Sequence, residues 1–146
     1  MKLKQLSVFL ENKPGRLREL CGLLAENGIN IITLSLADTE QFGILRLIVK
    51  DYDQAKKLLE AKGFVAKLTD VIAVEVNDQP GGLSEILAIE EASGISVEYM
   101  YAFVIKSGEK AVLLFRFDDM DKAVAALRQA HLPILDSVEL YQRAEA

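Results

Sequence analysis

Two asparagines beside glycine-containing turns are the residues of this chain best suited to bind a small molecule. Asn12 begins the segment Asn-Lys-Pro-Gly-Arg-Leu, and Asn30 follows a Gly-Ile pair. Pro14 fixes the backbone, Gly15 allows a ligand to approach it closely, and the helix predicted to follow points its free N–H groups outward, which suits a carboxylate. An asparagine amide can donate to a carboxylate and accept from an ammonium group. Together, Asn12 and Asn30 could hold a zwitterion.

A purely structural interpretation explains the same residues without a ligand. In that interpretation Asn12 caps the helix, the Pro-Gly pair turns the chain, and Asn30 closes the turn at Gly28. Turn chemistry alone leaves both interpretations open.

The same turn occurs twice at a fixed spacing. The segment from Asn12 returns as Asp-Gln-Pro-Gly-Gly-Leu from Asp78, and Gly-Ile-Asn-Ile from Gly28 returns as Gly-Ile-Ser-Val from Gly94. Both pairs of segments are separated by 66 residues. A period held over this length indicates two copies of one unit. We expect the domains to be residues 1–69 and 70–146.

The composition is that of a globular protein with two unequally charged halves. Of the 146 residues, 51% are hydrophobic and 27% are charged. Residues 1–70 hold 11 Lys/Arg and 9 Asp/Glu, whereas residues 71–146 hold 6 and 13, which gives net charges of +2 and −7. An acidic chain is a poor candidate for binding nucleic acid. Because a unit of about 70 residues is marginally stable alone, we expect the copies to pack on each other or on a second chain as a homodimer.

Cysteine usage and hydropathy indicate where the protein is found. Cys21 is the only cysteine and cannot form an internal disulfide. No signal peptide or apolar run of membrane-spanning length is apparent, so we expect a cytoplasmic protein that does not enter a membrane.

Alternating and helical patterns predict the order strand, helix, strand, strand, helix, strand in each copy. In the first copy, an apolar stripe from Leu17 to Leu24 predicts the first helix, and Asn27-Gly28 ends it. Right-handed crossovers then favour an antiparallel sheet with both helices on one face, the ferredoxin-like α+β arrangement. The predicted strands are 3–10, 30–37, 42–49, 64–68, 71–76, 96–105, 111–117 and 134–141, with further helices at 53–61, 82–93 and 121–130 and hairpins at 38–41 and 106–110.

These motifs and this order resemble the ACT domain, the amino-acid-sensing module, and the whole chain resembles a free-standing tandem ACT protein. The resemblance implies second strands placed edge to edge in one larger sheet, and ligands held between modules by the turn and the start of the second strand. The candidate ligand-binding residues that it implies are Asn12, Pro14, Gly15, Leu17, Asn30 and Ile31 in the first copy, and Asp78, Gly81, Gly82, Leu83, Ser96 and Val97 in the second.

Departures from the family pattern limit what the resemblance implies. Serine-sensing ACT domains have a histidine two residues before the turn asparagine, and here that residue is Leu10, so serine specificity is not implied. Asp78 and Ser96 replace the two asparagines in the second copy. A carboxylate at Asp78 favours the ammonium end of an amino acid and disfavours its carboxylate. We therefore expect fewer ligands than repeats.

The second strands differ between the copies. Small residues in the first copy, Thr33, Ser35 and Ala37, correspond to aromatic residues in the second, which are Tyr99, Tyr101 and Phe103. Alternation places each set on one strand face, where Tyr99 and Tyr101 could wall a slot for an aromatic or imidazole side chain. The alternative is core packing beneath the helices.

Other reactive residues have structural explanations. His131 is expected on a solvated loop and Cys21 in the core. Asp118, Asp119 and Asp121 precede or begin a helix, where carboxylates offset the helix dipole, so we expect capping rather than a metal site. No nucleophile pair is present, and we predict no catalytic residues, no metal and no cofactor.

Glu90 takes the place of Leu24 on the buried stripe of the first helix. A buried carboxylate is costly unless it is paired with an arginine or a tyrosine hydroxyl. We therefore expect a rotated helix or an exposed Glu90 near the helix end.

Two functions fit these observations. The first is a non-catalytic, allosteric regulatory protein that binds a free amino acid between repeats or chains and signals to an unidentified partner protein. The second is an ACT-type interaction module that dimerises and has lost the ligand. Asn12 and Asn30 favour the first, whereas Asp78 and Ser96 allow the second.

Overall fold

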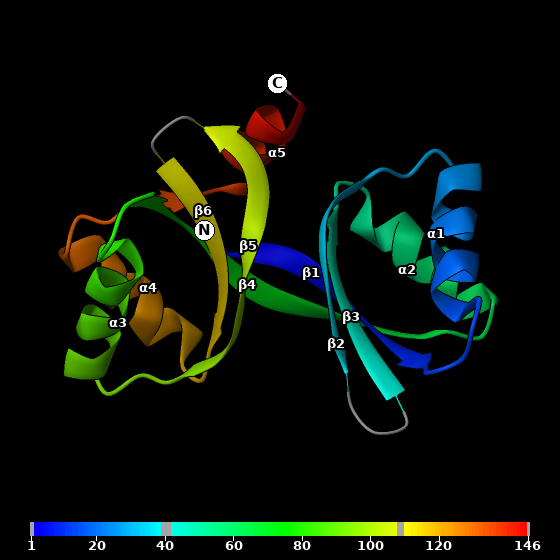
Figure 1. Ribbon diagram of the computed structural model, residues 1–146, viewed down its shortest axis with the longest axis horizontal. Coiled ribbons are helices and arrows are strands. Elements are labelled where there is room, and N and C mark those ends of the chain that lie inside the picture. Colours follow the sequence, from blue (N-terminus) through cyan, green and yellow to red (C-terminus); the bar gives the residue numbers. More distant parts are fainter. Residues whose placement is uncertain (1, 39–41, 108–109, 146) are drawn as a thin grey trace. The chain divides into compact units, whose positions relative to one another are not determined.

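The computed structural model describes residues 2–38, 42–107 and 110–145, and the chain divides into two compact units (Figure 1). The N-terminal unit is Lys4–Thr69. The C-terminal unit is Asp70–Ala146 together with Met1–Leu3.

The N-terminal unit is a sheet with two helices on one face (Figure 1). Strand β3 pairs antiparallel with both β1 and β2, which gives the order β2-β3-β1. Its elements are β1 (Leu3–Glu11), α1 (Arg16–Glu26), β2 (Ile31–Asp38), β3 (Phe42–Val49), α2 (Tyr52–Ala61) and the first part of β4 (Val65–Asn77). Most of the predicted hairpin at 38–41 lies outside the described residues.

Strand alternation and helix periodicity build the core of this unit. Leu6 and Val8 on β1 pair with Leu47 and Leu45 on β3, so these side chains share one face of the sheet. That face packs against the buried stripes of the helices, which contain Leu20, Leu24, Ala55 and Leu59.

The C-terminal unit repeats this arrangement. Strand β6 pairs antiparallel with β4 and β5, and β7 pairs with the other edge of β4. Its elements after β4 are α3 (Gly82–Ala92), β5 (Val97–Ser107), β6 (Lys110–Phe117), α4 (Met120–Gln129), β7 (Ile134–Leu135) and α5 (Ser137–Glu145). The centre of the predicted hairpin at 106–110 lies outside the described residues.

Two predicted elements differ from the structure. The strands predicted at 64–68 and 71–76 are one strand, β4, of 13 residues. The strand predicted at 134–141 was wrong beyond Leu135, because the chain turns at Asp136 and continues as α5. The Asp136 carboxylate accepts a hydrogen bond from the Glu139 N–H at 2.8 Å, and its carbonyl accepts from Leu140 N at 3.0 Å, so Asp136 starts this helix.

The predicted α+β fold of two βαββαβ repeats is confirmed, with α5 as an addition to the second repeat. That the sheets of the two units join edge to edge stays a prediction. Within the described parts of the chain, no helix is both long and apolar enough to cross a membrane.

Candidate functional site

Helix α1 begins without a side-chain cap. Its N-cap residue is Gly15, which has a left-handed backbone with φ 85°, and no side chain hydrogen-bonds to the cap. The preceding turn is closed by backbone bonds, from Lys13 N to Glu11 O at 2.8 Å and from Arg16 N to Lys13 O at 3.3 Å. The interpretation of Asn12 as the helix cap was therefore wrong. The first N–H groups of α1 have no partner within the helix, so this end can receive an anion.

A cavity of about 330 Å³ lies at this turn, within the N-terminal unit. We call it the turn pocket, and it is lined by Leu10, Glu11, Asn12, Lys13, Leu17, Leu36, Ala37, Asp38 and Gly43. The strand register explains how it forms, because Leu10 and Asp38 both pair with Gly43 and so the ends of β1 and β2 flank the start of β3. A Cβ on Gly43 would lie 3.1 Å from Leu36 Cδ1, so glycine leaves space for that leucine.

Groups of both charges, together with polar and apolar side chains, line the turn pocket. The Lys13 ammonium lies 2.8 Å from Glu11 Oε2, and this contact holds the pKa of the Glu11 carboxyl below its usual value. Lys13 is thus partly neutralised by its neighbour. Asn12 on the turn and Asp38 on β2 are both exposed and both line the pocket. Leu10, Leu17 and Leu36 supply apolar surface.

Asn30 and Ile31 lie at the other end of the N-terminal unit. Ile31 pairs with Val49, six residues along β3 from Gly43, which corresponds to about 20 Å. Asn30 is exposed just before β2. The unit therefore does not bring Asn12 and Asn30 of one copy into a single site. The predicted combination needs a turn and a β2 start from different modules.

The second copy has the same turn backbone but a different surface. Gly81 is the N-cap of α3 with φ 94°, and Gly82 N donates to Gln79 O at 3.1 Å. A smaller cavity of about 140 Å³ lies here, and Gly82 is the only predicted site residue among those that line it. Its lining is Glu75, Val76, Asn77, Gly82, Glu85, Lys110, Leu132 and Pro133. Glu85 at this opening disfavours a ligand carboxylate, whereas the charge of Glu75 is offset by an ion pair with Arg143.

The remaining predicted site residues of the second copy lie at two opposite ends of the unit, as they do in the first copy. Asp78, Gly81 and Leu83 are exposed at the turn. On β6, Lys110 pairs with Asn77, which is near the turn, and Phe117 pairs with Val97. Because Lys110 and Phe117 are seven residues apart, Ser96 and Val97 lie at the far end of the unit. There the Ser96 N–H donates to the Asp118 carboxylate at 3.0 Å.

The aromatic row of β5 lies on the sheet face turned away from the helices. Tyr101 and Phe103 pair with Leu114 and Val112, whereas the helix-side core contains the neighbouring β6 residues Leu113 and Phe115. The alternative interpretation, in which this row packs in the core beneath the helices, was therefore wrong. Phe103 is buried and the two tyrosines are half-buried. The small residues of β2 lie on the corresponding face of the N-terminal unit, where Thr33, Ser35 and Ala37 pair with Ile48, Arg46 and Ile44.

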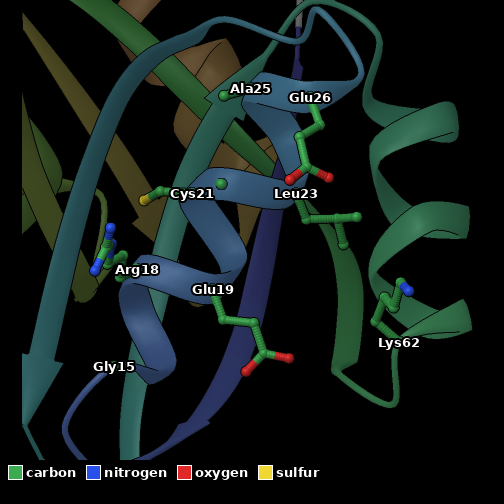
Figure 2. Close-up of a pocket in the computed structure, with 9 residues that line it drawn as sticks. Gly15, Arg18, Glu19, Cys21, Leu23, Ala25, Glu26 and Lys62 are labelled. Atoms are coloured by element: carbon green, nitrogen blue, oxygen red, sulfur yellow. The ribbon is translucent and has the colours of Figure 1, made fainter.

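A larger hollow, of about 820 Å³, runs along the outer surface of α1 and reaches Lys62 (Figure 2). Figure 2 shows Arg18 and Cys21 projecting from one side of the helix and Glu19, Leu23 and Glu26 from the other. Cys21 is half-buried against the core, and Arg18, Glu19 and Glu26 are exposed. An open surface of this kind gathers no set of converging polar groups, so we assign it no site.

The acidic residues before the second helices act as caps. The Asp51 carboxylate accepts from Gln54 N at 3.3 Å, and Asp119 accepts from Lys122 N at 3.1 Å. Asp121 pairs with Lys2 at 2.6 Å, which lowers the pKa of the Asp121 carboxyl. The described residues contain no cluster of metal-ligating side chains. His131 is exposed on the loop after α4, as predicted.

The expectation for Glu90 was wrong. Its side chain is buried at 1% exposure, and neither carboxylate oxygen has a hydrogen-bond partner in the part of the chain that the structure describes. Helix α3 is not rotated, because Ile86, one turn earlier on the same stripe, is fully buried. The replacement of Leu24 by Glu90 in the repeat was the sequence signal for this residue.

Known proteins are similar to this chain in sequence. It is 32% identical over 91 residues to the acetolactate synthase small subunit of Buchnera aphidicola subsp. Baizongia pistaciae, which covers 62% of this chain and 57% of that protein. It is 33% identical over 91 residues to the acetolactate synthase isozyme 3 small subunit of Escherichia coli strain K12, which covers 61% and 56%. The chain thus spans little more than half the length of these relatives.

Solved structures share the fold. The crystal structure of protein BT0572 from Bacteroides thetaiotaomicron has a TM-score of 0.90 and 39% identity, and the match covers 97% of both chains. The ligand-free regulatory subunit of aspartate kinase from Thermus thermophilus has a TM-score of 0.63 and 20% identity over 88% of this chain and 90% of that one, so it shares the fold alone.

A family model described as an ACT domain pair matches residues 1–143. The resemblance carried by the two Pro-Gly turns is confirmed by this match, which spans both copies. The chain therefore belongs to the ACT domain pair family.

Proposed function

We propose that this chain is a non-catalytic regulatory protein that binds a free amino acid and signals to a partner protein through altered packing. Its sequence relatives are named as small subunits of acetolactate synthase, so they work in assembly with another chain. By analogy, the partner of this protein is a catalytic subunit of a biosynthetic enzyme. The chain itself needs no cofactor for such a role.

The turn pocket is the observation that carries this proposal. The uncapped N–H groups at the start of α1 and the Asn12 amide suit the carboxylate of an amino acid. The Asp38 carboxylate suits its ammonium group, and Leu10, Leu17 and Leu36 offer apolar contacts to its side chain. The volume of about 330 Å³ is at the lower end of the range for small-molecule sites.

The site is completed by a second module. Asn30 and Ile31 lie about 20 Å from the turn within their own unit. They can meet a ligand at the turn of another copy, as in a homodimer. In that arrangement Tyr99 and Tyr101 contact an aromatic or histidine side chain, and Ser96 and Val97 form the second-copy counterpart of Asn30 and Ile31.

An interaction module without a ligand is the competing function. The second copy favours it, because Asp78 stands there in place of Asn12 and the cavity beside it is lined by Glu85 and by a Glu75 that is paired with Arg143. The first-copy pocket also contains two acids, Glu11 and Asp38, but Lys13 partly neutralises Glu11, and the Asp38 carboxylate suits the ammonium group of the ligand. We therefore assign ligand binding to the first-copy turn and assembly to the second copy.

A thermal-shift panel of the twenty amino acids tests the proposal, because a ligand that binds only the folded protein raises its melting temperature. We expect one or two amino acids to raise it in the wild type and in Gln54→Ala, an exposed amide control on α2. Asn12→Ala should reduce the rise strongly, because the affinity for the ligand falls. A similar reduction in Asn30→Ala would place the ligand between modules, whereas an unchanged rise there would confine it to the turn pocket. No rise with any amino acid at millimolar concentration would favour the interaction module.

A further inference from the structure

Glu90 is a buried acid without a partner, in a place where the first copy has an apolar side chain. Its exposed fraction is 1%, and both of its oxygens lack a hydrogen-bond partner among the described residues. A carboxylate in this state loses the hydration of its charge and gains no compensating bond. The uncharged acid is far less costly to bury, since it has no charge to desolvate.

The surroundings of Glu90 join three elements of the C-terminal unit. The Glu90 carbonyl accepts a hydrogen bond from Ile95 N at 3.0 Å, which connects α3 to the start of β5. The next residue, Ser96, is held by Asp118 through two bonds: Ser96 N donates to the Asp118 carboxylate at 3.0 Å, and Asp118 N donates to Ser96 O at 3.1 Å. Asp118 therefore connects the start of β5 to the end of β6 through these two hydrogen bonds.

Charged groups of both signs lie around this junction. Asp118, in the connection between β6 and α4, carries the same sign of charge and disfavours an ionised Glu90. The Lys122 ammonium of α4 lies 4.0 Å from the point that a Cβ on Gly94 would occupy, so it is close to the turn after α3. On α3 itself, Glu91 is exposed. The sheet presents apolar side chains to this helix, which include Ile72, Val74, Val97, Phe115 and Phe117.

We propose that Glu90 is held as an uncharged acid inside the C-terminal unit and that its ionisation loosens the junction of α3, β5 and β6. Burial and, to a smaller extent, the Asp118 charge raise the pKa of Glu90 to about 7 from an ordinary value of 4.5. Between these values the folded protein keeps a proton that the unfolded chain has lost. Stability therefore falls as the pH rises through this window and levels off above it. This makes the C-terminal unit sensitive to pH near neutrality, independently of whether an amino acid binds.

Two measurements on the whole chain of 146 residues test the proposal. The first is an NMR titration of the Glu90 side-chain carboxyl carbon in wild-type protein labelled with ¹³C-glutamate. We expect a midpoint near 7, and the Ser96 amide signal should shift with the same midpoint. A Glu90 midpoint near 4.5, or a Ser96 signal unaffected by the titration, would overturn the proposal.

The second measurement is urea unfolding of the C-terminal unit at several pH values. Between about pH 5.5 and about pH 8, the unfolding constant of the wild type should rise about 30-fold relative to that of Glu90→Leu, which restores the first-copy residue. Glu90→Gln should also lose this dependence, whereas the control Glu91→Gln, at the exposed neighbouring position, should keep it. Equal pH dependence of the wild type and Glu90→Leu would contradict the proposal.

Discussion

Gly63 and His131 hold matching places after the second helix of each unit, and both have a left-handed backbone, with φ of 84° and 60°. Each closes its helix in the same way, since Gly63 N donates to Glu60 O and His131 N donates to Arg128 O, both at 3.0 Å. This conformation is easy for glycine but costly for a residue with a Cβ. The C-terminal unit therefore carries a local strain that the N-terminal unit avoids.

Replacing His131 with glycine should relieve this strain. We expect His131→Gly to raise the free energy of unfolding by about 0.5–1 kcal/mol, since the gain in the left-handed region exceeds the entropy that glycine adds to the unfolded chain. Urea unfolding measures the change. The control is Lys62→Gly, because Lys62 has an ordinary φ of −97° and glycine there should only destabilise. A loss of stability in His131→Gly would show that the histidine makes a compensating contact.

Two helix glycines should respond in opposite directions to alanine. A Cβ on Gly82 would lie 2.3 Å from the Asn77 carbonyl oxygen, which is backbone and cannot easily move, whereas a Cβ on Gly22 would meet nothing within 4 Å. We expect Gly82→Ala to cost about 1–3 kcal/mol through the forced shift of the turn. Gly22→Ala should gain about 0.5–1 kcal/mol of helix propensity. Thermal unfolding of both variants checks this, and equal effects would mean that the turn before α3 is not tightly packed.

The repeated Pro-Gly turn made most of the fold predictable from the sequence. Its fixed spacing indicated two similar units, and alternation predicted the strand at 3–10, which contains Leu6 and Val8, and the strand at 42–49 that pairs with it. The incorrect part of the strand predicted at 134–141 arose where tertiary contacts override local pattern. Ile134-Leu135 continues as an apolar run that suits a strand, but Asp136 can cap a helix, and burial of Leu140 selects that helix. Local sequence does not determine whether a strand or a helix forms there.

The candidate site was only partly predictable, for a geometric reason. Asn12 and Leu17 could be placed at the turn because they are near in sequence to the start of α1. The distance from Asn12 to Asn30 depends on the direction of β2, which runs parallel to β1 and carries Asn30 to the opposite end of the sheet. Asp38 and Leu36 reach the turn for the same reason. No motif marks these two residues, so the register alone reveals them.

The ion pair between Arg143 and Glu75 fixes α5 to the strand before the second turn. Arg143 also contacts Glu139 at 3.0 Å, and contact with both glutamates raises the pKa of the arginine. The Glu75 side chain is only 15% exposed, so loss of its cation leaves a mostly buried carboxylate unpaired. We expect Arg143→Ala to lower the free energy of unfolding by about 1–3 kcal/mol, measured by urea unfolding. Arg128→Ala, an exposed arginine in the last turn of α4, is the control and should change stability little. Equal effects of the two variants would show that the Glu75 contact does not hold α5.

The unequal turns predict one ligand per chain rather than two. The first turn presents Asn12 and a lysine already paired with Glu11, whereas the second presents Asp78 and lies beside a cavity lined by Glu75 and Glu85. Calorimetric titration with the amino acid found in the thermal-shift panel should therefore give a stoichiometry near one. Asp78→Asn should leave this number unchanged, because the charge of Glu85 stays in place at the second turn. Asn12→Ala should reduce binding at least tenfold through loss of a hydrogen bond to the charged ligand. A stoichiometry of two, or a stronger effect of Asp78→Asn than of Asn12→Ala, would assign the ligand to the second copy instead.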